Sequence, residues 1–117
     1  MTLEERTSSS VTILDVAGRM TIEVLQNMPL TVKVRRLLQD GRAHILVNLD
    51  GVPYLDTTGI SDLVGAYVAT RRQGGSLKLL HLTPRVRTVL TVTRLLTIIE
   101  AYEDEAAAIG SFESVVA

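Results

Sequence analysis

Apolar residues recur along the chain with two alternating spacings, one typical of strands and one typical of helices. Short, nearly continuous apolar runs rich in β-branched residues predict strands. Apolar residues at i, i+3, i+4 and i+7 predict amphipathic helices. The clearest helical stripe is formed by Ile60, Leu63, Val64, Tyr67 and Val68, in a helix that has Arg71 and Arg72 in its last turn and stops at Gly74-Gly75.

The remaining segments alternate in the same way. The predicted strands are a short edge strand at Leu3–Thr7 and core strands at Val11–Ala17, Ala43–Leu49, Leu77–Leu82 and Thr97–Tyr102. The other predicted helices run from Asn27–Pro29 to Leu38, from Pro84 to Leu90, and from Glu103-Asp104-Glu105 to Phe112, with Ala106, Ile109 and Phe112 docking the last one.

Local residues indicate where these helices begin. Asn27 is the predicted cap of the first helix, because Pro29 is tolerated in a first turn but not in a helix interior. Thr83 is the predicted cap of the helix that starts at Pro84. The segment Thr21–Gln26 is predicted to connect the first core strand to the first helix as a turn or a short helical piece.

The order of elements predicts an α/β domain with a mixed, mostly parallel sheet of four to five strands and four helices. The 117 residues suit a single domain over 1–117 with a hydrophobic core of its own. In parallel sheets, functional sites gather at the carboxyl ends of the strands. The segment Asp50–Gly59 lies at such an end, so we expect the site there.

Composition excludes several classes of function. The net charge of −1, with Lys and Arg spread along the chain, predicts neither a nucleic-acid partner nor a membrane partner. The absence of Cys removes thiolate metal sites and disulfides and suits the cytoplasm, where we expect the protein to reside. Residues 1–10 are polar and do not resemble a secretory signal.

Catalytic chemistry is poorly represented. His44 and His81 each lie in an apolar run and are interpreted as strand residues, and no ligand spacing predicts a metal site. No nucleotide-binding or nucleophile motif is present, so we expect no cofactor. Asp50 and Asp56 remain an alternative acid/base pair. We nevertheless predict that the protein is not an enzyme and has no catalytic residue.

The segment Leu55-Asp56-Thr57-Thr58-Gly59-Ile60 joins a predicted buried strand to the clearest helix. A purely structural interpretation makes Asp56 or Thr57 the helix cap. The segment also resembles the hydrophobic-D-x-S-S-G-[LI] motif of single-domain STAS proteins, the anti-sigma factor antagonists of bacteria. The turn at Gly18-Arg19-Met20, the junction Gln73–Leu79 and the helix after Thr83-Pro84 are also similar, so the resemblance spans nearly the whole chain.

The resemblance implies a phosphorylation switch at the second hydroxyl residue of the motif, Thr58, with Thr57 as the alternative. The implied partners are an anti-sigma factor that is also a GHKL-type serine/threonine kinase, and a phosphatase that reverses the modification. The unphosphorylated protein would bind the anti-sigma factor and free the sigma factor. The implied partner-binding residues are Asp56, Thr57, Thr58, Gly59, Arg19 and Met20.

Elementary electrostatics agrees with a switch at this position. A phosphate carries about −1.5 to −2 charges at neutral pH, and a helix N-terminus favours that charge through its dipole and exposed N–H groups. The chain differs from the usual motif in carrying Thr-Thr for Ser-Ser, and Arg19 stands where many members are acidic. Two alternatives stay open: a STAS subunit of a stress-signalling scaffold or a lipid-transport complex, and an enzyme or small-ligand binder that uses Asp50, Asp56 and Thr58.

Overall fold

The structure is a computed structural model that describes residues 1–24 and 26–113. In the described part of the chain, two consecutive strands are followed by helices and strands in alternation. The elements are β1 (Thr2–Ser8), β2 (Val11–Ala17), α1 (Pro29–Gln39), β3 (His44–Gly51), α2 (Thr57–Arg72), β4 (Ser76–Leu80), α3 (Pro84–Val92), the 3₁₀ helix η1 (Leu95–Thr97), β5 (Ala101–Tyr102) and α4 (Glu105–Phe112).

The strands form one sheet in the order β1-β2-β3-β4-β5. β1 pairs with β2 antiparallel, and every other neighbouring pair is parallel. Most of the apolar residues of β2, β3 and β4 are buried because helices cover both faces of the sheet, which explains the continuous apolar runs of these strands. The mixed, mostly parallel sheet with four α-helices confirms the predicted fold class.

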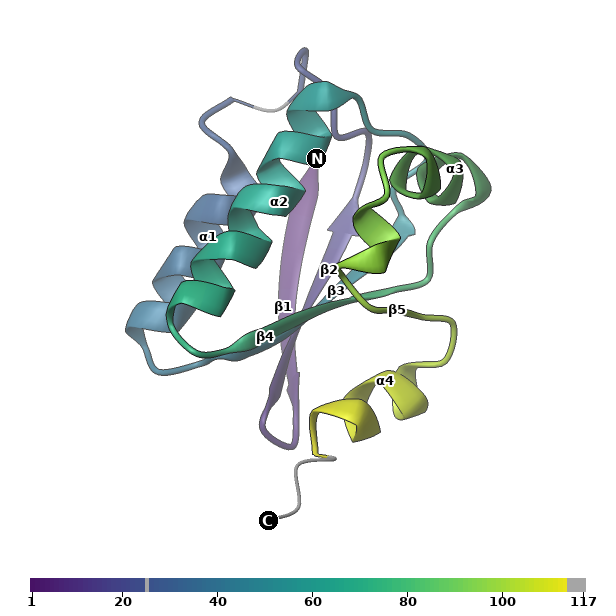
Figure 1. The fold of residues 1–117 in the computed structure, drawn as a ribbon. Helices are drawn as coiled ribbons and strands as arrows, with labels where there is room; N and C mark the ends of the chain where they lie inside the picture. Colours follow the sequence, from purple (N-terminus) through teal and green to yellow (C-terminus); the bar gives the residue numbers. More distant parts are fainter. Residues whose placement is uncertain (25, 114–117) are drawn as a thin grey trace.

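The helices lie on the two faces of the sheet in unequal numbers (Figure 1). α1, α2 and α3 share one large core with the sheet, whose members include Leu30, Leu63 and Leu90. α4 covers the other face through a smaller core in which Ala108 and Phe112 meet the opposite side of β2, β3 and β4. Because β2 and β3 end near the N-terminus of α2, their following loops meet at one end of the molecule.

The last predicted strand, Thr97–Tyr102, is wrong over most of its length. The chain forms η1 at Leu95–Thr97 and joins the sheet only at Ala101–Tyr102. Arg94 takes a left-handed conformation with φ of 62° and turns the chain into η1. The apolar residues of this segment therefore belong to a turn that packs near α3, in which Ile99 is buried, and not to a strand.

Smaller differences concern element ends. β4 stops at Leu80, so His81 lies outside the strand that was predicted to contain it, in a left-handed conformation with φ of 55°. His44 lies in β3 as predicted, with its ring 5.7 Å from that of Phe112. In α4, Ala106 is exposed and does not dock, because Ala108 faces the sheet.

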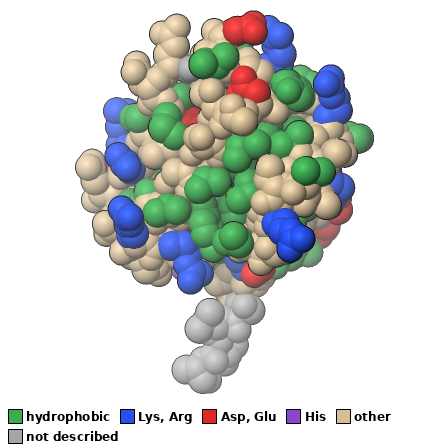
Figure 2. Space-filling view, turned by 45° about the horizontal axis from the view of Figure 1, so that its top comes forward, with side chains coloured by type: hydrophobic (Ala, Val, Ile, Leu, Met, Phe, Trp, Pro, Cys, Tyr) green, Lys and Arg blue, Asp and Glu red, His purple; other side chains and the backbone are tan. Residues whose placement is uncertain are grey.

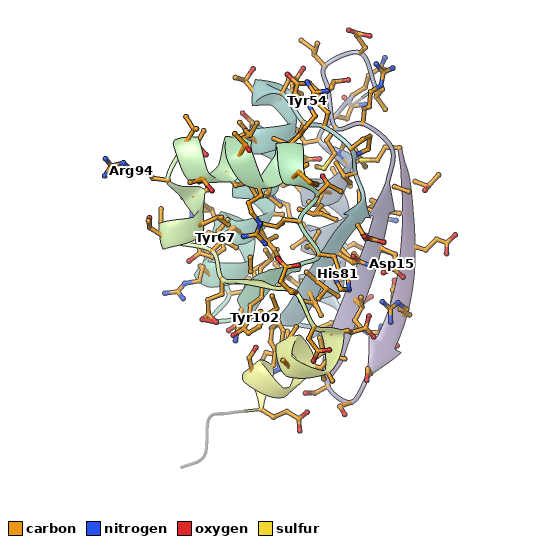
Figure 3. The ribbon with its side chains drawn as sticks, turned by 90° about the vertical axis from the view of Figure 1, so that its right-hand side faces the viewer. Asp15, Tyr54, Tyr67, His81, Arg94 and Tyr102 are labelled. Carbon is orange, nitrogen blue, oxygen red and sulfur yellow. The ribbon has the colours of Figure 1, made fainter. Side chains whose placement is uncertain are left out.

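α4 is held to the sheet by an arginine as well as by its apolar residues. The Arg6 guanidinium on β1 donates to the carboxylates of Asp15 on β2 and Glu105 on α4, with N–O distances of 2.6–3.1 Å. Figure 3 shows Asp15 on the strand side of the molecule, near α4. Hydrogen bonds from Arg6 lower the pKa of both carboxyl groups, and the two carboxylates raise the pKa of Arg6.

Acid should therefore weaken this contact. A carboxyl group whose folded-state pKa is lowered stabilises the fold above its unfolded pKa and loses that contribution as the pH falls through the folded value. We expect the melting temperature to fall between about pH 5 and pH 2, and Arg6→Gln to reduce the part of that fall due to Asp15 and Glu105. Thermal melts at each pH check this; an identical acid dependence in Arg6→Gln would contradict it.

Candidate functional site

Three loops meet at the carboxyl ends of β2, β3 and β4. The Gly18 N–H donates to the carbonyl of Gly51 at 2.8 Å, and the Met20 N–H donates to the carbonyl of Tyr54 at 3.0 Å. From the third loop, the Thr83 hydroxyl donates to the carbonyl of Val52 at 2.7 Å. These hydrogen bonds join the three loops to one another beside the N-terminus of α2.

Thr83 occupies the N-cap position of α3, as predicted, but its hydroxyl is directed elsewhere. Its side chain makes no capping bond to the helix, and its hydroxyl donates to the Val52 carbonyl instead. The predicted capping role of this side chain is therefore wrong. Thr83 ties the loop after β4 to the loop after β3, which is the loop that leads into α2.

Asp56 is the N-cap of α2 and binds two segments at once. Its Oδ1 accepts from the N–H groups of Thr58 at 2.9 Å and Gly59 at 3.2 Å, which are orphan donors of the first helical turn. Its Oδ2 accepts from the Ile22 N–H, 3.0 Å away, in the loop after β2. The sequence left two alternatives for the cap of this helix, Asp56 or Thr57, and the structure confirms Asp56.

These bonds lower the pKa of the Asp56 carboxyl group and so favour its ionised form. The backbone N–H of Ile22 is the largest cause of a lowered pKa, and the N–H groups of Gly59 and Thr58 act in the same direction. Asp56 is therefore ionised at neutral pH and unsuited to act as a general acid. Asp50 is exposed near the end of β3.

Thr57 and Thr58 are the first two residues of α2. Thr57 is exposed and Thr58 is half-buried. Sequence reasoning expected a phosphate here to meet free N–H groups. Because Asp56 already accepts from Thr58 and Gly59, those two donors are occupied, while the helix dipole still favours a negative charge at this position.

Gly59 allows the start of α2 to lie directly against the loop after β2. A Cβ atom at this position would stand 2.2 Å from the carbonyl oxygen of Met20 and 2.8 Å from the Cβ of Leu55. Met20 itself is fully buried and pairs with Leu55 as an isolated parallel bridge. Its side chain cannot contact a partner, so the prediction for Met20 is corrected to a supporting role.

Arg19 and Arg85 supply positive charge near these loops. Arg19 is exposed, as a partner-binding residue must be. The Arg85 guanidinium on α3 lies 4.7 Å from the centre of the Tyr54 ring, in a cation–π contact. Figure 3 shows Tyr54 at the same end of the molecule as the start of α2.

Asp62, which sequence reasoning did not single out, is fully buried one turn into α2. Its carboxylate accepts from the backbone N–H groups of Leu30 at 3.0 Å and Thr31 at 2.8 Å, in the first turn of α1. The Thr31 hydroxyl donates to the Asp62 carbonyl at 2.8 Å. A carboxylate on one helix thus caps the neighbouring helix.

The predicted cap of α1, Asn27, is consequently wrong. Asn27 and Met28 both have positive φ, and Met28 occupies the N-cap position without a side-chain hydrogen bond. Pro29 has no N–H to satisfy, as expected of its position. The next two donors of the helix are satisfied by Asp62 instead of by a residue preceding the helix.

A model of the STAS domain matches residues 3–108, which is most of the chain. The chain belongs to the STAS domain family. This STAS domain is 34% identical over 87 residues to an anti-sigma-B factor antagonist of Bacillus subtilis, covering 74% of the chain and 77% of the relative. The family resemblance seen in the sequence is thereby confirmed.

Solved structures share the fold of this STAS domain. An anti-sigma factor antagonist from Mycobacterium paratuberculosis aligns with a TM-score of 0.81 and 18% identity, over 97% of this chain and 94% of the other. The unphosphorylated form of the antagonist SpoIIAA aligns with a TM-score of 0.71 and 14% identity, over 97% and 100%. The two TM-scores establish a common fold, and at these low identities the likeness extends to the fold alone.

The STAS domain carries apolar side chains on the face that holds the site. Figure 2 brings the top of Figure 1 toward the viewer and shows a connected apolar area in the middle of this face, with Lys and Arg side chains toward its margins. Ile22, in the loop bound by Asp56, is 67% exposed. Such a surface is suited to contact with another protein.

Within residues 1–24 and 26–113, no three His, Cys, Asp or Glu side chains come together in a way that would bind a metal ion. The same residues contain no helix with the length and apolar character needed to traverse a bilayer.

Proposed function

We propose that this STAS domain is an anti-sigma factor antagonist that binds an anti-sigma factor kinase and is released from it by phosphorylation of Thr58. The observation that carries the proposal is the position of Thr58. It stands in the first turn of α2, beside a cap, Asp56, that also binds the loop after β2. One modified side chain therefore lies where two surface segments meet.

The relatives support this role. The Bacillus subtilis relative and the Mycobacterium paratuberculosis structure are both named as antagonists of anti-sigma factors. SpoIIAA has been solved in a phosphorylated form, which aligns with this chain with a TM-score of 0.70 and 15% identity, over 94% of this chain and 99% of the other. A phosphorylated state is thus known for a protein of the same fold.

The proposed binding surface contains Thr57, Thr58, Arg19 and Ile22 as accessible or partly accessible side chains. Gly59 and Met20 are buried beneath them, and together with the half-buried Asp56 they fix the distance between the start of α2 and the loop after β2. The partner would contact the first group directly. It would depend on the second group for the shape of the surface.

A phosphate on Thr58 changes this surface more than it changes the fold. It adds about −1.5 to −2 charges beside the carboxylate of Asp56, whose own charge is already held by three backbone N–H groups. A partner closed over this position would have to remove water from the phosphate or meet it with like charge. The complex is therefore destabilised while the domain remains folded.

Phosphotransfer tests the proposed site. The purified protein is incubated with the candidate GHKL-type kinase and ATP, and the modified residue is mapped by mass spectrometry. We expect one phosphate on Thr58, unaltered incorporation in Thr57→Val, and loss of incorporation in Thr58→Val, since valine keeps the β-branched shape without the hydroxyl. The exposed Thr57 is the matched control.

Different outcomes separate the proposed function from its alternatives. Modification of Thr57 alone would move the switch by one residue. Tight kinase binding without any phosphotransfer would indicate a STAS adaptor that is not switched at this site. A phosphatase that removes the phosphate from Thr58 would complete the proposed cycle.

A further inference from the structure

The stretch 22–31, which runs from the loop after β2 into the first turn of α1, is hydrogen-bonded at both ends to carboxylates of α2 and its N-cap. At its start, Asp56 accepts from the Ile22 N–H at 3.0 Å. At its end, Asp62 accepts from the N–H groups of Leu30 and Thr31 at 3.0 and 2.8 Å. We name residues 22–31 the tethered segment, of which residue 25 lies outside the described residues.

In the described residues, the N–H groups of Leu30 and Thr31 have no side-chain acceptor other than Asp62. Met28, at the N-cap of α1, makes no capping side-chain bond, and Pro29 donates nothing. Gly65, one turn beyond Asp62, brings the helices so close that a Cβ there would stand 2.7 Å from the Thr31 hydroxyl oxygen. The start of α1 is thus positioned by α2, through Asp62 and the close contact at Gly65.

Asp62 is also close to the proposed switch in the geometry of α2. Thr58 and Asp62 are four residues apart, so they lie on the same side of the helix, one turn from each other. Asp56 and Asp62 therefore flank Thr58 along the helix and connect the same turns of α2 to the two ends of the tethered segment.

We propose that Asp62 is a positioning residue of the partner-binding surface: it fixes the C-terminal end of the tethered segment, as Asp56 fixes the N-terminal end. The tethered segment presents Ile22, which is 67% exposed and whose N–H binds Asp56, the cap that precedes Thr57 and Thr58. It also presents Met28, which is 36% exposed and lies at the N-cap of α1 beside Gly65 of α2. The inference rests on the proposed function, because it assumes that the partner binds this face. It assigns a role to a buried carboxylate that the site itself does not include.

The first test needs no partner. In Asp62→Asn one carboxylate oxygen becomes an NH₂ group, which cannot accept, so the side chain can no longer accept from Leu30 through one oxygen and from Thr31 through the other. Amide hydrogen exchange followed by NMR should show the N–H groups of Leu30 and Thr31, and the described residues of the tethered segment, exchanging about tenfold faster or more. Thr31→Val, which removes only the hydroxyl bond to Asp62, is the milder variant and should give a smaller increase in the same residues.

A matched control separates positioning from general loss of stability. Thr70→Val also removes a fully buried hydrogen bond from α2, between the Thr70 hydroxyl and the Ala66 carbonyl, far along the helix from Asp62. It should leave exchange in the tethered segment unchanged after correction for global stability. Equal acceleration in Asp62→Asn and Thr70→Val would overturn the proposal.

The second test uses the kinase shown to phosphorylate Thr58. Its affinity for Asp62→Asn should fall about tenfold relative to Thr70→Val, measured by calorimetry at a temperature where both variants are folded. Unchanged affinity, in a variant whose tethered segment exchanges faster, would overturn the proposal and leave the switch at Thr58 intact. Absence of phosphotransfer to the unmutated protein would instead contradict the proposed function, and the exchange experiment would still test the fastening by Asp62.

Discussion

Gly59→Ala is expected to destabilise the protein by about 3 kcal/mol, although alanine favours helices over glycine by about 1 kcal/mol. The added Cβ would stand 2.2 Å from the backbone oxygen of Met20 and 2.9 Å from its Cβ. The first contact is with backbone that is itself hydrogen-bonded to the N–H of Asp56, so it cannot move alone. The whole start of α2 would have to shift away from the loop after β2.

Gly110→Ala is the matched control for this substitution. Gly110 is also within a helix. A Cβ there would have no described atom within 4 Å apart from its chain neighbours and the backbone of its own helix. It should leave the stability unchanged or raise it by up to about 1 kcal/mol. Urea denaturation measures both variants, and a loss in Gly59→Ala no larger than in Gly110→Ala would contradict the close contact between Gly59 and Met20.

Asp62→Ala is expected to cost about 3 kcal/mol of unfolding free energy. The substitution leaves the N–H groups of Leu30 and Thr31 without their acceptor in a buried position, where each unsatisfied donor costs about 1–3 kcal/mol. Alanine also removes the volume of the carboxyl group from the contact between α1 and α2. The expected loss therefore exceeds that of an ordinary capping substitution, which is about 1 kcal/mol.

Asp104→Ala provides that ordinary comparison. Asp104 is exposed and caps α4 through a single bond from the Ala107 N–H at 2.8 Å. The two variants remove the same chemical group from two helix caps that differ in burial. Midpoints and slopes of urea unfolding compare them. A loss in Asp62→Ala equal to that in Asp104→Ala would mean that the buried cap contributes no more than a solvent-exposed one.

Local patterns were sufficient to predict most of the architecture. Continuous apolar runs gave β2, β3 and β4 because parallel strands covered on both faces have no polar side. The stripe from Ile60 to Val68 gave α2 because helical spacing places those side chains on one side. Even the polar edge strand β1 was predicted, although its partner in the sheet was not.

Long-range hydrogen bonds explain what was missed. Asn27 has a side chain suited to capping, but the carboxylate of Asp62, 32 residues from Leu30, accepts the hydrogen bonds from the first turn of α1. Thr83 likewise bonds to Val52, 31 residues away. Neither choice is visible in neighbouring sequence, because it depends on which loops the sheet brings together. The segment before β5 was misassigned because Ile99 is buried beneath a turn, where apolar spacing is indistinguishable from that of a short strand.

The site was predicted in part. The sequence offered Asp56 or Thr57 as the cap of α2 and placed this segment at the carboxyl end of a strand, because both inferences depend on local residues, and the structure selects Asp56. It did not reveal that the same carboxylate binds Ile22, nor that Met20 is buried, because both follow from the pairing of two loops. Phosphorylation of Thr58 remains a prediction.

Calorimetric titration of the partner kinase with the two forms of the protein tests the switch most directly. The Thr57→Val background ensures that the exposed neighbour carries no phosphate, so that the two forms differ only at Thr58. We expect the form phosphorylated on Thr58 to bind at least about 100-fold more weakly than the unphosphorylated form, a difference of about 2.7 kcal/mol, with circular dichroism spectra that coincide. Equal affinity of the two folded forms would contradict the proposed switch.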